Sequence, residues 1–195
     1  MEKLIFATNN QNKVDEVRKV LGDIFEIITL KEAGIDTDIP EPYDSLAENA
    51  TAKSGYIYKL TKKNCFSEDT GLEVEALNGQ PGVKSARYAG ELRSFEDNID
   101  KLLINLAPFT NRNARFRTVI SLIIDGKEVF FEGICEGKIA LERKGNQGFG
   151  YDAVFLPSGS KKSFGEMDVE EKNGFSHRKK AMIKLIEYLS NLYTI

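Results

Sequence analysis

Two adjacent carboxylates stand in the segment CFSEDTGLEV, residues 65–74. Glu68 and Asp69 follow a short apolar run and precede a Thr-Gly pair, and Glu41 is a further acid in a loop that contains prolines. Carboxylate oxygens are the ligands that Mg²⁺ takes when substrate phosphates also hold it, and a carboxylate can orient or deprotonate an attacking water. These acids indicate either solvated turns or, if a phosphorylated ligand binds nearby, a metal site.

A basic segment, SHRKK at residues 176–180, begins the last predicted helix. The N-terminus of a helix already presents free N–H groups and the positive end of the helix dipole. Cations such as His177 and Arg178 in the first turn therefore cost about 0.3 to 1 kcal/mol each when unscreened. A bound anion would relieve this penalty, so the segment is a candidate anion site; the alternative is a solvated basic turn.

The segment TNNQNK, residues 8–13, is a second candidate for anion binding. It connects a predicted strand to a predicted helix, and such a turn exposes helix N–H groups to which Lys13 adds a point charge. The segment lacks the glycines of a Walker loop, but its asparagines, Asn9, Asn10 and Asn12, can supply amide contacts and tolerate left-handed backbone. The alternative is ordinary turn and capping chemistry.

The glycine-rich segment GNQGFGYD, residues 145–152, is a candidate for binding a flat ligand. Glycines allow the backbone to come close to such a ligand, Phe149 can stack on it, and Asp152 can form a hydrogen bond with its edge. A glycine-rich loop of this kind can equally be a connector between strands.

Other polar and sulfur-containing residues favour structural roles. The segment GQPGVKSARY, residues 79–88, contains a Pro-Gly turn, with Ser85 and Arg87 as weaker candidates for the site. Cys65 and Cys135 lie in strand-like apolar surroundings without the paired spacing of metal ligands, and we expect them to be reduced core residues. The single histidine of the chain makes a histidine-based metal cluster difficult to build.

Hydrophobic periodicity predicts the elements that must position these residues. The first half of the chain contains a strand over 3–8, a helix after NNQN, a strand over 25–29, a helix over about 45–62, and short strands in CFSED and LEVEAL separated at Thr70-Gly71. A helix ending at Leu106, a hairpin around Asp125-Gly126 and a strand after GNQGFGYD follow. The last helix begins at Ser176, and its buried face holds Met182, Leu185, Ile186, Leu189 and Leu192. The patterns Ser45 to Glu48 and Ser94 to Asp97 predict helix caps. The order predicts an α/β fold with a mixed sheet.

The bulk composition excludes some classes of function. The chain has 195 residues, of which 41% are hydrophobic, enough for the core of a single two-lobed domain over 1–195. A net charge of −3 gives no global field for a nucleic acid or a membrane surface. The apolar run in MEKLIFATNN is too short for a signal peptide or a membrane span, so we expect a cytoplasmic protein.

Six motifs in this order resemble those of the inosine triphosphate pyrophosphatase (RdgB-like) family of house-cleaning enzymes. The motifs are TNNQNK, EPYDSLAENATAK, SEDTGL, GQPGVKSARY, GFGYD and KNGFSHR. They extend from residue 4 to about 180, and six ordered motifs are far more specific than any one of them. The departures include Asn9 where the family usually has glycine and Ala153 where proline is common.

The resemblance implies a homodimeric, Mg²⁺-dependent hydrolase that converts the non-standard purine triphosphates ITP, dITP and XTP to the monophosphate and pyrophosphate. It also implies an elongated mixed sheet with flanking helices, in which the nucleotide lies in a cleft between two lobes. Two alternatives remain. One is another enzyme, a Maf-like pyrophosphatase for other nucleotides, and the other is a nucleotide sensor without turnover.

The resemblance assigns roles to residues by motif. Glu41 and Asp69 would bind Mg²⁺, and Asp69 would be the general base. The remaining residues would contact the substrate: Thr8, Asn9, Asn10, Gln11, Asn12, Lys13 and Lys53 at the triphosphate, Thr70 beside it, and Phe149, Gly150, Tyr151, Asp152, Lys172, His177 and Arg178 around the base. Donors placed for a 6-oxo purine would be left unpaired by the 6-amino group of adenine.

Overall fold

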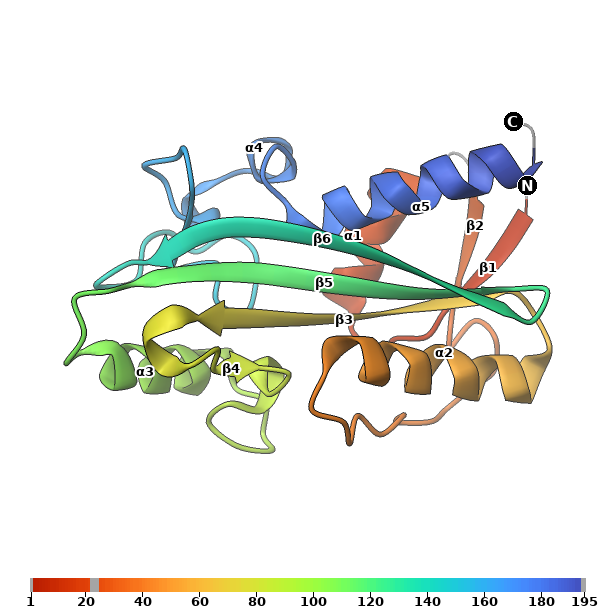
Figure 1. Cartoon of the computed structure of the whole chain (residues 1–195), viewed down its shortest axis with the longest axis horizontal. Helices are drawn as coiled ribbons and strands as arrows, with labels where there is room; N and C mark the ends of the chain where they lie inside the picture. Colours follow the sequence, from red (N-terminus) through yellow and green to blue (C-terminus); the bar gives the residue numbers. More distant parts are fainter. Residues whose placement is uncertain (1, 22–24, 194–195) are drawn as a thin grey trace. The chain divides into compact units, whose positions relative to one another are not determined.

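The computed structural model describes residues 2–21 and 25–193. The chain forms two compact units. Unit 1 comprises Met1–Asp69, Thr118–Gly133 and Arg178–Ile195, and unit 2 comprises Thr70–Arg117 and Ile134–His177. Three of the four boundaries fall inside long strands, which therefore contribute residues to both units: β3 (Cys65–Val74), β5 (Asn113–Ile124) and β6 (Lys127–Ile139) (Figure 1). The fourth boundary lies between His177 and Arg178.

In the described part of the chain, seven strands form one sheet in the order β2-β1-β3-β5-β6-β7, with β4 beside β3. The shorter strands are β1 (Glu2–Phe6), β2 (Phe25–Thr29), β4 (Pro81–Gly82) and β7 (Phe155–Pro157). Strand β1 is parallel to β2 and β3, whereas β4 is antiparallel to β3 and β7 is antiparallel to β6. The predicted α/β fold with a mixed sheet is therefore confirmed.

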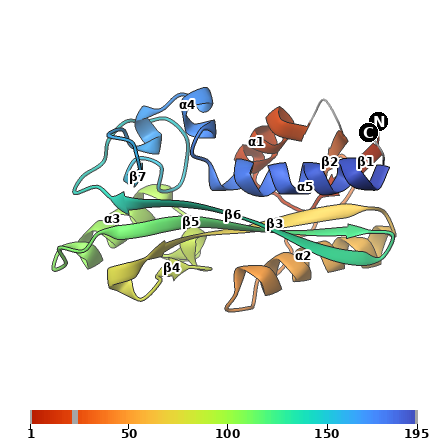
Figure 2. The ribbon, with the colours of Figure 1, turned by 45° about the horizontal axis from the view of Figure 1, so that its top comes forward.

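Helices cover both faces of the sheet in unit 1. Helices α1 (Gln11–Leu21) and α5 (His177–Tyr193) pack on one face, and α2 (Leu46–Thr61) packs on the other (Figures 1 and 2). Because successive strand residues point to opposite faces, Phe66 joins the core under α1 and α5, whereas Cys65 joins Ile57 of α2 in a separate core.

The first turn of α2 is capped as its sequence predicts. The Ser45 hydroxyl accepts a hydrogen bond from the Glu48 backbone N–H (3.2 Å) and donates one to the Glu48 carboxylate (2.6 Å). The hydroxyl thus satisfies one of the N–H groups that a helix start leaves without a partner. Ser94 caps α3 (Phe95–Leu106) in the same way, through the N–H of Asp97.

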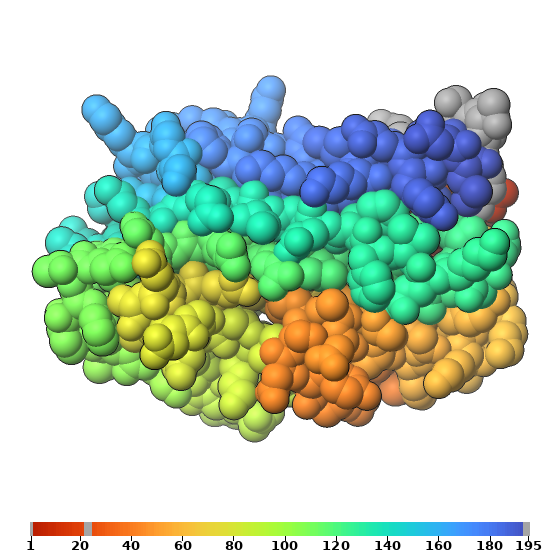
Figure 3. All heavy atoms as spheres, viewed as in Figure 1, coloured from red at the N-terminus to blue at the C-terminus, as the bar shows by residue number. Residues whose placement is uncertain are grey.

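The predicted hairpin connects β5 to β6. Asp125 and Gly126 form its two-residue turn, with φ angles of +49° and +78°. Positive φ at both positions is what a type I′ turn needs, and Asp-Gly accepts it at low cost. In unit 1 the hairpin lies at the surface beside α5, where Lys184 donates to the backbone oxygen of Glu132 (2.6 Å) (Figure 3).

Unit 2 has its own apolar core. Helix α3 and the 151–167 segment contribute to a cluster that also contains residues of β3, β5 and β6. Around this core lie η1 (Glu75–Leu77), η2 (Ser85–Arg87), η3 (Phe164–Glu166) and α4 (Val169–Asn173). This core is separate from the two apolar clusters of unit 1.

The prediction of two short strands separated at Thr70-Gly71 is wrong. Strand β3 runs without interruption from Cys65 to Val74, and the end of LEVEAL is the 3₁₀ turn η1. A Cβ atom at position 71 would lie 2.7 Å from the backbone oxygen of Gly82, so glycine is needed for the close approach of β4. This glycine serves strand pairing and does not end the strand.

Three smaller expectations can be compared with the structure. Met182, Leu185 and Leu189 are buried as predicted and Ile186 is partly buried, but Leu192 is 47% exposed, so the buried face of α5 ends one turn earlier than predicted. Both cysteines are free and buried, and burial raises the pKa of Cys65 to about 12. Within residues 2–21 and 25–193, no helix is long and apolar enough to cross a membrane.

Candidate active site

The turn between β1 and α1 forms the N-terminus of α1. The Thr8 hydroxyl accepts from the backbone N–H of Asn10 (3.1 Å), and the Asn10 side-chain oxygen accepts from the N–H of Lys13 (3.4 Å). These bonds fix the start of the helix, and they place Lys13 in its first turn. The capping chemistry considered as an alternative is therefore present, and it orients the residues expected at the triphosphate.

The other polar residues of this turn have different surroundings. Asn9 donates from its side chain to the backbone oxygen of Thr37 (3.0 Å), which ties the turn to the loop before α2, and it is not among the described residues with positive φ. Its substitution for glycine therefore needs no left-handed backbone. Gln11 donates to Asp15 along α1 (2.7 Å), and both Gln11 and Asn12 are exposed. Contact of these residues with a substrate stays a prediction.

The adjacent acids of β3 point to opposite faces of the sheet. Glu68 contacts Lys13 of α1 and Arg178 of α5, and Asp69 contacts Lys53 of α2. This separation follows from the two-residue period of a strand, since neighbouring side chains alternate between faces. The two carboxylates therefore belong to two different charge clusters.

Glu68 is the centre of a buried cluster of ion pairs. Both of its carboxylate oxygens accept from Arg178 Nε, at 2.9 and 2.8 Å, and Oε1 also lies 3.1 Å from Lys13 Nζ. The second anion on Arg178 is Glu16 of α1, which contacts Arg178 Nη1. The positive start of α5, a candidate anion site with a solvated basic turn as the alternative, is thus offset by two carboxylates of the chain itself.

The pKa shifts of Glu68 and Arg178 both favour the charged forms. Burial alone would raise the pKa of Glu68, but Arg178 and Lys13 outweigh it and lower the pKa from 4.5 to about 2. Burial lowers the pKa of Arg178, but Glu68 and Glu16 outweigh it and raise the pKa above its ordinary value. Glu68 is therefore an anchor for two cations, and the alternative of a solvated turn is wrong for this residue.

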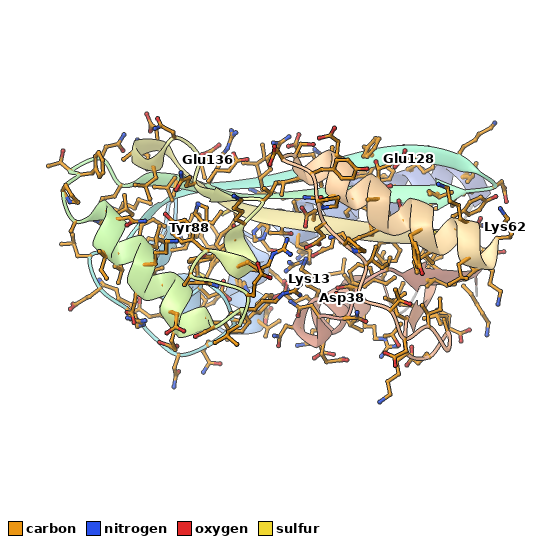
Figure 4. All side chains as sticks on the ribbon, turned by 90° about the horizontal axis from the view of Figure 1, so that it is seen from below. Lys13, Asp38, Lys62, Tyr88, Glu128 and Glu136 are labelled. Carbon is orange, nitrogen blue, oxygen red and sulfur yellow. The ribbon has the colours of Figure 1, made fainter. Side chains whose placement is uncertain are left out.

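The second cluster brings together Glu41, Lys53 and Asp69. Lys53 Nζ lies 2.5 Å from Glu41 Oε1 and 3.1 Å from Asp69 Oδ1, and it also donates to the backbone oxygen of Glu68 (2.8 Å). The two predicted metal ligands are thus joined by one ammonium group. Burial lowers the pKa of Lys53, but Asp69 and Glu41 outweigh it and raise the pKa, so the ammonium is charged. Figure 4 labels Lys13, on α1 of unit 1, and Lys62, at the C-terminal end of α2.

Asp69 has a carboxylate oxygen that is open to a proton or a cation. Its Oδ2 is buried and has no hydrogen-bond partner among the described residues. Burial, opposed by Lys53 and Lys13 and assisted by Glu41, raises the pKa of Asp69 above 3.8. A buried acceptor without a partner is costly unless a ligand, a water or a metal ion uses it. The atom is therefore set up to accept a proton or to bind a cation.

The residues present fit a magnesium ion. In the described part of the chain, no three His, Cys, Asp or Glu side chains come together to hold a metal by themselves. Mg²⁺ does not need such a cage, because it is commonly held by one or two carboxylates, by water and by substrate phosphates. Glu41 and Asp69, with the unpartnered Oδ2, supply that donor set.

In unit 2, Asp152, Lys172 and Phe149 form one compact group. Lys172 of α4 donates to Asp152 Oδ2 (2.7 Å), which also accepts from the backbone N–H of Phe149 (2.9 Å). The ammonium lies 5.2 Å from the centre of the Phe149 ring. A Cβ atom at Gly148 would lie 2.0 Å from Asp152 Oδ2, so this position needs glycine. Asp152 therefore shapes the loop that carries Phe149.

The remaining residues predicted at the base have varied positions. Tyr151 is part of the unit 2 core and donates from its hydroxyl to the backbone oxygen of Ser85 (2.7 Å), and burial raises its pKa. His177 is buried and stacks on Phe116, with ring centres 4.7 Å apart. Gly150 follows Phe149 with a positive φ, and Thr70 is half-buried in β3. Arg178 belongs to unit 1, and its contact with the base stays a prediction.

The weaker candidates Ser85 and Arg87 lie in a structural turn. The Ser85 hydroxyl donates to the backbone oxygen of Gly82 (2.6 Å) and accepts from the N–H of Leu72 (2.9 Å). These bonds link η2 to the turn before it and to β3. The structural role favoured for this segment from its sequence is therefore the one that Ser85 has.

Sequence reasoning missed two kinds of residue. One is Glu16, which pairs with Arg178. It stands three positions after Lys13 on α1, and residues at this spacing are neighbours on a helix, so its place beside a predicted cation was visible in the sequence. Phe116 and Phe164 surround the groups at His177 and Lys172, with the Phe164 ring centre 5.5 Å from the Lys172 ammonium. These two lie in strand and turn segments whose apolar character indicated only a core position.

Comparison with known proteins identifies the family of this chain. Residues 4–188 match the model of the Ham1 family, and the chain belongs to that family. The resemblance stated from the six motifs is thereby confirmed.

Individual relatives are similar over nearly their whole length. The chain is 48% identical to a dITP/XTP pyrophosphatase of Flavobacterium psychrophilum, covering 97% of this chain and 100% of the relative. It is 51% identical to a dITP/XTP pyrophosphatase of Porphyromonas gingivalis, covering 97% and 98%. Among solved structures, a HAM1 protein from Coxiella burnetii is similar with a TM-score of 0.90 at 34% identity, covering 98% of this chain and 100% of that chain.

Proposed function

We propose that this protein hydrolyses the non-standard purine nucleoside triphosphates dITP, XTP and ITP to the monophosphate and pyrophosphate. The observation that carries the proposal is the buried, unpartnered Oδ2 of Asp69, in a cluster with Lys53 and Glu41 at the middle of β3. The names of relatives that are 48 and 51% identical support the same activity. The reaction would remove unwanted nucleotides from the pool, in the cytoplasm.

Unit 1 carries the groups for the chemical step. Lys13, in the first turn of α1, and Lys53 would compensate the charge of the triphosphate, with Thr8 and the asparagines of the turn beside them. Mg²⁺, held by Glu41, Asp69 and the phosphates, would neutralise charge on the triphosphate. Asp69 would accept a proton from water while the water oxygen bonds to phosphorus and the bond between the α- and β-phosphates breaks.

Unit 2 carries the groups suited to the base. Phe149 offers a flat apolar surface, and Lys172 offers N–H donors that are already oriented by Asp152. A 6-oxo purine can accept from such a donor, whereas the 6-amino group of adenine would leave it unpaired. We infer that Phe149, Gly150 and Lys172 contact the base and that Tyr151 and Asp152 position them. The nucleotide-binding cleft between two lobes stays a prediction.

We also propose that the protein is a homodimer. Three large apolar side chains of unit 2 are strongly exposed, namely Leu92 (93%), Leu141 (81%) and Ile104 (72%). Exposed apolar groups of this size are candidates for burial in a protein interface. Sedimentation equilibrium should give twice the 21.9 kDa mass of the chain, and a monomer at micromolar concentration would overturn the proposal.

The activity can be tested with a panel of triphosphates. Purified protein with Mg²⁺ is incubated with dITP, XTP, ITP, ATP, dTTP and UTP, and the loss of each triphosphate is followed by ion-exchange chromatography. The proposal expects the first three to be consumed much faster than the others. Comparable rates on dTTP or UTP would favour a Maf-like pyrophosphatase instead, and binding without any loss would indicate a sensor.

A further inference from the structure

Lys53 has an unusual position for a residue expected to contact phosphate. Its ammonium is almost entirely enclosed, and it contacts Glu41, Asp69 and the backbone oxygen of Glu68 at 2.5 to 3.1 Å. Three N–H donors are therefore matched by three acceptors, two of which are the carboxylates that would hold the metal ion. In this arrangement the ammonium neutralises negative charge of Glu41 and Asp69 that a bound metal ion would otherwise neutralise.

The surrounding structure holds Lys53 in this place. The next residue on α2, Ser54, forms a hydroxyl-hydroxyl hydrogen bond with Ser121 of β5 (2.6 Å). The Ser67 hydroxyl of β3 donates to the backbone oxygen of Ala50, one turn before Lys53 (2.5 Å). Both contacts are buried and fix α2 against the strands, so the ammonium cannot leave its partners by a simple shift of the helix.

Charge balance then decides when a divalent cation can bind. Without nucleotide, Lys53 has already neutralised half of the charge on Glu41 and Asp69. A divalent ion placed beside the ammonium would leave an excess of positive charge in a poorly solvated site. A triphosphate brings the missing negative charge, and it gives the ammonium new acceptors.

We propose that Lys53 is a built-in counter-ion that occupies the metal-binding carboxylates in the nucleotide-free protein, so that the divalent cation binds together with the triphosphate and not before it. This inference rests on the proposed function, since it takes Glu41 and Asp69 as the metal ligands. It assigns Lys53 a task before substrate binds, in addition to any contact with phosphate.

The test is a titration of the nucleotide-free protein with Mn²⁺, in which electron paramagnetic resonance reports the free ion. Lys53→Met, which keeps the length of the side chain and removes its charge, should bind Mn²⁺ at least about tenfold more tightly than the wild type. Adding Asp69→Asn to this variant should abolish the gain. Lys53→Arg, which keeps the charge, should behave as the wild type, and so should Lys59→Met, which removes an exposed charge from the same helix.

Several results would overturn the inference. One is a Lys53→Met variant whose affinity for Mn²⁺ matches that of the wild type, and another is a Lys53→Arg variant that binds as tightly as Lys53→Met. If Lys53→Met does not fold, Lys53→Gln makes the same comparison. The wild type also gives an answer without any change at Lys53: if it binds Mn²⁺ tightly and Asp69→Asn lowers that affinity about tenfold, the inference is wrong. Triphosphate loss by the wild type tests the proposed function separately.

Discussion

The two units of this protein use buried charge in different ways. In unit 1, four carboxylates and three cations form ion pairs around the middle of β3 and the starts of α1 and α5. In unit 2, one carboxylate and one ammonium, Asp152 and Lys172, pair beside the aromatic rings of Phe149 and Phe164. The first group is rich in ion pairs whose charged members can take new partners, and the second is rich in flat apolar surface.

This difference matches the two chemical parts of a nucleoside triphosphate. A polyphosphate with a divalent cation brings large charges of both signs. A site that contains both carboxylates and cations offers each of these charges a partner of opposite sign. An uncharged purine is better recognised by stacking and by a few placed donors. The following variants separate the two sets of residues, beginning with the largest expected effect.

Replacing Asp69 should remove most of the turnover and leave the fold intact. Asp69→Asn keeps the shape of the side chain but loses the proton acceptor and the metal ligand, so kcat for dITP should fall by about 10² to 10⁴-fold. The fold should be retained, because Glu41 and the backbone oxygen of Glu68 still accept from Lys53, although the loss of one buried ion-pair partner lowers the free energy of unfolding. A urea titration and steady-state kinetics check both statements, and near-normal turnover would contradict the role of Asp69.

Replacing its neighbour Glu68 should mainly affect stability. Glu68→Gln leaves Lys13 and Arg178 buried with one carboxylate fewer, and the free energy of unfolding should fall by about 3 to 5 kcal/mol. Glu26→Gln, at an exposed pair with Lys3, is the matched control and should cost less than about 1 kcal/mol. Equal losses in the two variants would contradict the anchoring role of Glu68.

The Glu68 contribution should also depend on pH in a defined direction. Its pKa is about 2 in the folded protein and ordinarily 4.5, so the unfolded chain binds the extra proton first. The stabilisation is therefore fully present above about pH 5 and is lost as the pH falls toward 2. The difference in unfolding free energy between wild type and Glu68→Gln should shrink over this interval, and a difference that stays constant would show that the charge of Glu68 is not its source.

Replacing Lys172 in unit 2 should alter the choice of base. Lys172→Met should lower kcat/KM for dITP by about 10- to 100-fold and lower kcat/KM for dATP less, because only the oxygen of the 6-oxo purine accepts a hydrogen bond from Lys172. The double variant Asp152→Asn with Lys172→Met removes both charges, so an unpaired carboxylate cannot explain its loss. Lys161→Met, at an exposed lysine, is the control. Equal losses for both nucleotides in the double variant would contradict the assignment.

Much of the fold was predictable because local patterns determine it. The Asp-Gly turn, the Ser45 and Ser94 caps and the periodic apolar positions of α3 all act within a few residues. The error at Thr70-Gly71 has a different origin, since the need for glycine there comes from the close approach of β4. Leu192 was assigned to the core by periodicity alone, which cannot tell where the packing partners of a helix end.

The site was predictable in its membership but not in its pairings. Strand alternation could have shown that Glu68 and Asp69 face opposite ways, since both stand inside one β-pattern. The partner of Glu68 could not have been found in this manner, because Arg178 lies 110 residues away in the sequence. The bridge from Lys53 to Glu41 and Asp69 likewise depends on how α2 packs on β3 and β5.

The identity of the phosphate product tests the central claim most directly. Wild-type protein is incubated with dITP and Mg²⁺, and phosphorus-31 NMR follows the products as they appear. The charge cluster around Asp69 is proposed to direct water to the bond between the α- and β-phosphates, so dIMP and pyrophosphate should form in equal amounts. Release of single phosphate with accumulation of dIDP would contradict the account.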